Sequence, residues 1–65
     1  MTANLNTSPN LYDCDKVYEA LINAHNDLSD DDSSKLNARL ILLLINHIGD
    51  EDVIMEAITA AKSNI

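Results

Sequence analysis

The segment LNARLILLLINHI, residues 36–48, places apolar side chains on two sides of one predicted helix. At 100° per residue, one side holds Leu36, Leu40, Leu43, Leu44 and His47. Nearly the opposite side holds Ala38, Ile41, Ile45 and Ile48. A helix that faces water needs only one apolar arc, so a helix with two arcs must be covered on two sides.

The chain is too short to provide that cover easily, because its 65 residues make one domain at most. A domain of this size buries only about 60% of its unfolded surface and usually needs further support. An internal disulfide cannot supply it, since Cys14 is the only cysteine. No Cys/His cluster has the spacing of a structural zinc site, so we expect no cofactor. Oligomerisation or docking on a larger protein is the support that remains.

The net charge of the chain argues against two classes of binding partner. Four basic and 11 acidic residues give 4 − 11 = −7, which argues against nucleic acid and against an anionic membrane surface. The longest apolar run, residues 40–45, is far shorter than a membrane span requires. The chain begins without the basic and apolar regions of a secretory signal, and its cysteine is single. We therefore expect a cytoplasmic protein.

Helix signals divide the rest of the chain. Residues 1–11 are polar and aperiodic, which predicts a flexible, disordered tail, and residues 12–65 form a single three-helix domain. Asp13 can cap a first helix that runs to about Asp27, with an apolar arc that includes Val17, Leu21 and Leu28. The outward face of this helix is polar, which is typical of an amphipathic surface helix.

Two further helices follow. Ser29 resembles the N-cap of a capping box, with three aspartates in the first turn of a helix over 30–48. Gly49, the only glycine, stands where a left-handed residue would end that helix, and Asp50 can cap a third. The short connections predict an all-α, three-helix antiparallel bundle with helix 2 central.

A second chain is the neighbour that we favour for helix 2. The apolar arc of the third helix is rich in alanine, which covers little area, and one large side chain left uncovered forfeits about 1.5–3 kcal/mol. We expect a homo-oligomer, with a dimer favoured, or a larger protein partner; a simple monomer remains open. The candidate interface consists of Asn37, Ile41, Leu44, Ile45, Ile48 and Met55.

Polar residues on the apolar arcs offer an alternative. His25 and His47 each lie near the C-terminal end of a helix, where histidine can donate to free carbonyls. The alternative is a metal- or ligand-binding module that uses both histidines, and a general base ranks behind it. Arg39 can pair with Asp32 or with a partner's carboxylate, or remain solvated, and Asn37 can fix the register of an interface.

The stretches VYEALINAHNDLS and SSKLNARLILLLINHIGD, with a looser match over 53–61, resemble a family of short bacterial all-helical proteins catalogued only as a domain of unknown function. The polar residues that carry the resemblance are His25, Asn37, Arg39, Asn46, His47 and Asp50. The family has no established activity. We expect no enzyme, because a general base such as His47 would need a nucleophile or a substrate pocket, and a three-helix chain implies no cleft. The resemblance also implies an accessory role, with a flavin-dependent enzyme as one candidate partner. Cys14 departs from the family pattern.

Overall fold

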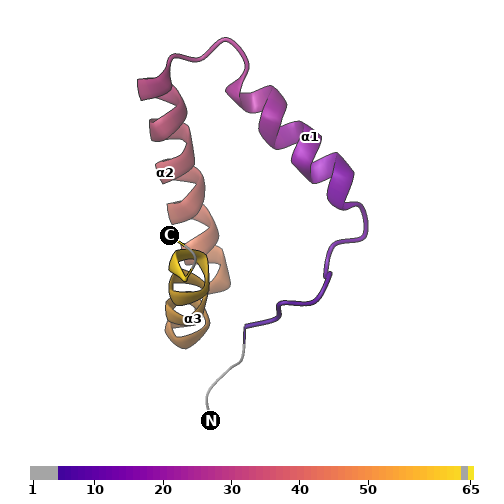
Figure 1. Cartoon of the computed structure of the whole chain (residues 1–65), viewed down its shortest axis with the longest axis vertical. Helices are drawn as coiled ribbons and strands as arrows, with labels where there is room; N and C mark the ends of the chain where they lie inside the picture. The colour runs from indigo at the N-terminus through magenta and orange to yellow at the C-terminus, as the bar shows by residue number, and fades with distance from the viewer. Residues whose placement is uncertain (1–4, 64) are drawn as a thin grey trace.

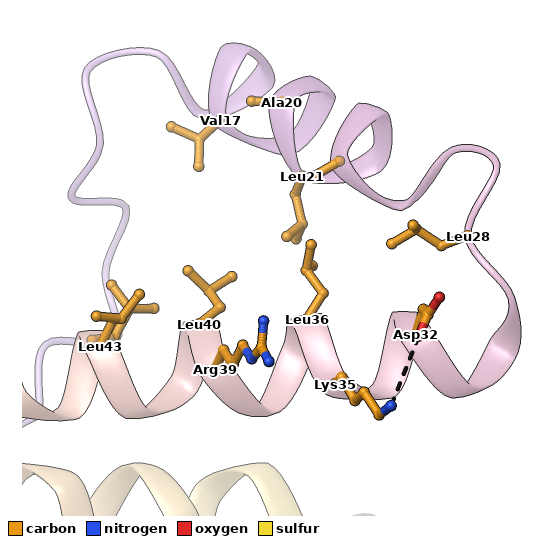
Figure 2. Close-up of a pocket in the computed structure, with 12 residues that line it drawn as sticks. Val17, Ala20, Leu21, Leu28, Asp32, Lys35, Leu36, Arg39, Leu40 and Leu43 are labelled. Atoms are coloured by element: carbon orange, nitrogen blue, oxygen red, sulfur yellow. Dashed lines mark ion pairs between the residues drawn. The ribbon is translucent and has the colours of Figure 1, made fainter.

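Three helices make up the computed structural model, which describes residues 5–63 and 65. They are α1 (Cys14–His25), α2 (Asp30–Ile48) and α3 (Glu51–Lys62), and the described residues contain no strand. Figure 1 shows α1 leaving α2 at the connection between them and α3 returning along the far end of α2. The predicted all-α fold of three helices is confirmed, and Figure 2 shows α1 and α3 on opposite sides of α2.

Each helix begins at the cap that the sequence predicts. Asp13 Oδ1 accepts from the Lys16 amide at 3.0 Å. Ser29 Oγ accepts from the Asp32 amide at 3.1 Å.

The third cap has the same geometry, since Asp50 Oδ1 accepts from the Val53 amide at 3.2 Å. Each bond satisfies one of the amides that a helix start leaves without an intrahelical partner. Acidic residues fill the first turn of all three helices, where the helix dipole favours negative charge.

Left-handed residues follow the first two helices. Gly49 ends α2 with φ +64°, and its amide donates to the Ile45 carbonyl at 3.0 Å. The boundary predicted for the first helix is corrected from Asp27 to His25. Asn26 leaves the helix with ψ 137°, and Asp27 has φ +65°, a conformation that aspartate tolerates better than most residues.

The helices do not close around a core. In the described part of the chain no residue is buried, and the helices contact one another sparsely. The radius of gyration is 13.7 Å, against roughly 11 Å for a compact domain of this length. Figure 1 shows the reason, because α1 and α2 diverge from their connection as the two arms of a V. The close packing of a three-helix bundle is therefore not confirmed.

α3 partly covers the end of α2. Half-buried residues lie at this contact: Ile45 on α2, and Val53, Ile54 and Ala57 on α3, whereas Ile41 and Ile48 on the same side of α2 are 54% and 51% exposed. The connection of two residues, Gly49 and Asp50, holds the start of α3 close to the end of α2. This local contact is the nearest approach to a core in the described structure.

The first described residues of the N-terminal segment lie beside α3. Residues 5–13 form no helix, and the half-buried Leu5 donates its amide to Glu56 Oε2 at 3.0 Å. Of the predicted flexible tail, residues 1–4 lie outside the described residues, and flexibility of the remainder stays a prediction. No helix in the described part of the chain has the length and apolarity needed to cross a bilayer.

Replacing Gly49 by alanine should destabilise the protein by about 1 kcal/mol, because a Cβ disfavours the left-handed conformation. A Cβ at this position would meet only the Asn46 carbonyl oxygen, at 3.7 Å, so the cost is in the backbone and not in a clash. Urea unfolding followed by circular dichroism at a fixed protein concentration measures it. Gly49→Asn should cost less, and equal stability of Gly49→Ala and the unaltered chain would contradict this account.

Replacing Ser29 by alanine should cost about 1 kcal/mol, because the Asp32 amide loses its acceptor. Ser34→Ala is the matched control, since Ser34 lies exposed inside α2, where alanine is the better helix former. The same unfolding measurement on both variants separates a capping effect from a general serine effect. A loss of stability for Ser34→Ala as large as that for Ser29→Ala would argue against capping.

Candidate functional site, an apolar cleft

An apolar cleft of about 930 Å³ separates α1 from α2. Figure 2 shows its two walls, with side chains of α1 and of α2 pointing toward one another across the gap. We call this feature the α1–α2 cleft. Its lining consists of Val17, Ala20, Leu21, Ala24, Leu28, Asp32, Lys35, Leu36, Arg39, Leu40, Leu43 and Leu44.

The α2 wall is built from leucines spaced three and four residues apart. Leu36, Leu40, Leu43 and Leu44 share one face because this spacing matches the helical period. Leu36 and Leu40 are half-buried, whereas Leu43 is 69% exposed and Leu44 is 51% exposed. The cover given by α1 therefore falls away toward the open end of the V.

The side chains of the α1 wall reach less far into the cleft, because large and small side chains alternate along it. Val17 is 52% exposed and Leu21 is 38% exposed, and Ala20 and Ala24 lie between and beside them. Leu28 follows α1 in the connection to α2 and points into the cleft near its vertex (Figure 2). The alanines leave space in which side chains from another helix could pack.

Three charged side chains border the cleft: Asp32, Lys35 and Arg39. Lys35 Nζ lies 3.8 Å from Asp31 Oδ2 and 4.0 Å from Asp32 Oδ1, and the side chains of this lysine and both aspartates are well exposed. Exposed pairs of this kind contribute little to stability. Arg39 also lines the cleft, and among the described residues it forms no ion pair. Of the alternatives that the sequence left open for Arg39, the pairing with Asp32 is not seen, and Asp32 pairs with Lys35.

The interface residues expected from the sequence lie mostly outside the cleft. Of that set only Leu44 lines it. Ile45 is half-buried, and the others are exposed: Asn37, Ile41, Ile48 and Met55.

Sequence reasoning did not include Leu36, Leu40 and Leu43, which line the cleft, among the candidate interface residues. The leucine arc was visible on the helical wheel, but the wheel did not show which helix would cover it. The signal that could have found these residues is the composition of α1, whose apolar arc contains two alanines between its larger side chains. A wall of that kind cannot fill the space beside four leucines.

The two histidines lie at opposite ends of α2. His25 ends α1 next to the connection, half-buried, and its carbonyl accepts from the Leu28 amide at 3.2 Å. His47 is exposed in the last turn of α2. At 1.5 Å per residue, α2 separates them by about 25 Å. Neither lines the cleft, and the described residues contain no group of three His, Cys, Asp or Glu side chains that could hold a metal ion.

Of the remaining residues that carry the family resemblance, one has a local structural role and two show no specific side-chain contact among the described residues. Asp50 caps α3, whereas Asn37 and Asn46 are exposed on α2.

A second, shallower hollow of about 580 Å³ lies under the N-terminal segment, between Leu5 and the Met55 side of α3. The α1–α2 cleft is the larger and more apolar of the two, so it is the candidate functional site.

The comparisons with known proteins add a family and no activity. No curated protein and no solved structure matches the chain. A family model described as "Protein of unknown function (DUF2783)" matches residues 5–63, which confirms the resemblance to a family of short proteins of unknown function. The match includes all three helices and both walls of the α1–α2 cleft. The chain therefore belongs to the DUF2783 family.

Proposed function

We propose that the protein is a small cytoplasmic interaction module, without chemistry of its own, that acts through α2. It associates with itself or serves as an accessory subunit of a larger protein. The observation that carries this proposal is the open leucine wall of α2, which one chain leaves in contact with water.

The area of this wall is large for so small a chain. Fully covering one leucine contributes about 1.5–3 kcal/mol, and a domain of this size has a core worth only ~3–5 kcal/mol. Leaving Leu43 and Leu44 more than half exposed therefore forfeits a sizeable share of the available stability. A protein surface laid over α2 would recover it.

The lining chemistry supports binding over catalysis. Most of the cleft residues are aliphatic, and the charged ones lie at its border. Such a lining recognises apolar side chains by area and shape and presents no nucleophile and base side by side. The exposed Cys14 is a free thiol, which is compatible with a reducing compartment and supports the cytoplasm as the location.

A protein is the partner class that the charge favours. The net charge of −7 opposes both phosphate backbones and anionic lipid headgroups. Apolar area is then the available source of affinity. An accessory association with a larger enzyme and self-association both use that area, and both fit this proposal.

The size of the protein in an extract of the cells that make it tests the proposal. A tagged chain at its native level should elute in size-exclusion chromatography well above the position of a 7.1 kDa monomer. Leu43→Glu should move it toward the monomer position, because it places a charge on the leucine wall. Leu42→Glu, on an exposed position outside the cleft, should leave the elution unchanged. Elution of the unaltered chain as a monomer at all concentrations would rule the proposal out.

A further inference from the structure

We propose that the α1–α2 cleft is filled by the α1–α2 pair of a second copy of this chain. This inference rests on the proposed function and names its partner. Two V-shaped pairs related by a two-fold axis would place their four apolar walls around one four-helix core. We identify the occupant from the exposed area of the chain, the shape of the cleft walls and the charge of the cleft lining.

The exposed area of the chain is larger than that of a folded monomer by about what a dimer interface covers. The surface is 6060 Å², whereas a compact monomer of 7.1 kDa exposes roughly 4,100 Å². Even if the extended N-terminal segment accounts for half of the excess, roughly 1,000 Å² per chain remains. Two copies would then cover about 2,000 Å² together, which lies within the range of stable homodimers.

The α1 wall leaves space beside its alanines that side chains of a second copy can fill. The α2 wall presents four leucines, and the α1 wall presents alanines between larger side chains. In a two-fold arrangement the leucines of one copy can lie over Ala20 and Ala24 of the other, since the same patch occurs on both chains. Alternation of large and small side chains across facing helices is what allows them to interdigitate.

The charges at the cleft argue against a basic protein as its occupant. Lys35 and Arg39 against Asp32 give the lining a net charge of 2 − 1 = +1, so the rest of the chain carries −7 − 1 = −8. A basic protein would be drawn to the other surfaces of the molecule and not to the cleft.

The connection between the arms opposes closure of the V within one chain. Two backbone hydrogen bonds brace it, from the Asn26 amide to the Asn23 carbonyl and from the Leu28 amide to the His25 carbonyl, both at 3.2 Å. Asp27 holds its left-handed conformation between them. Leu28 occupies the vertex of the cleft, so α1 cannot swing onto α2 without displacing it (Figure 2).

Sedimentation equilibrium of the purified full-length chain tests the dimer. The unaltered protein should approach 2 × 7.1 = 14.2 kDa as its concentration rises. Leu40→Glu should raise the dissociation constant at least about a hundredfold, because each dimer loses two buried leucines. Leu42→Glu makes the same change two residues away on a 66% exposed side chain outside the cleft, and should alter the dissociation constant less than about threefold.

Val17→Glu repeats the test from the α1 wall and should act like Leu40→Glu. Should either variant fail to fold, the melting temperature of the unaltered chain decides, because it must rise with protein concentration if folding and dimerisation are coupled. A dimer weakened by Leu42→Glu and not by Leu40→Glu would overturn the cleft as the interface.

The result in cell extract separates this inference from the proposed function. A purified chain that stays monomeric with a concentration-independent melting temperature, yet elutes in a larger complex from extract, overturns the second copy and leaves the interaction role standing. A chain that is monomeric in both overturns the two together.

Discussion

The shortage of apolar cover for α2 is the constraint on which the rest of the structure depends. The helix is apolar on two sides, and the same chain provides only two short helices of 12 residues each to cover it. Neither side is fully covered: Ile45 is half-buried on the α3 side and Leu36 and Leu40 on the α1 side, whereas other apolar residues of both sides are more than half exposed. Stability in a small domain comes from burial of apolar area. Exposed apolar area of this kind therefore lowers the stability of the chain unless another protein surface buries it.

Local interactions account for the helices themselves. Three side-chain caps and acidic first turns define the starts, and a left-handed glycine defines the end of α2. These interactions join residues at most a few positions apart, so they form without a core. A chain with well-specified helices and little tertiary contact is the result, and such helices are marginal alone in water.

The connections between the helices determine the shape of the α1–α2 cleft. Gly49 and Asp50 fold α3 back tightly, whereas the four residues between α1 and α2 hold these helices apart with Leu28 at the vertex. The open V presents two walls at once, and a partner helix that enters it contacts both. An interface made in this way resembles a domain core divided between chains, which is typical of obligate homodimers.

The sequence by itself determined what depends on neighbouring residues. The three caps, the C-terminal end of α2 and the two-sided apolar pattern of residues 36–48 were predicted correctly, since each follows from side chains within a few positions or from the helical period. The sequence also predicted that α2 would lie between the other two helices. The end of α1 was placed two residues late, because the left-handed turn at Asp27 has no glycine to announce it.

Only the tertiary structure decided which side of α2 lines a cleft. The candidate interface expected from the sequence includes Ile41 and Ile48, which are more than half exposed, whereas the cleft lies on the leucine side, over Leu36, Leu40 and Leu43. The two arcs are both apolar on a helical wheel, so periodicity cannot predict which of them lines the cleft. The cleft depends on the angle at which each neighbouring helix leaves α2. That angle depends on backbone torsions in two short connections and on the packing of Leu28.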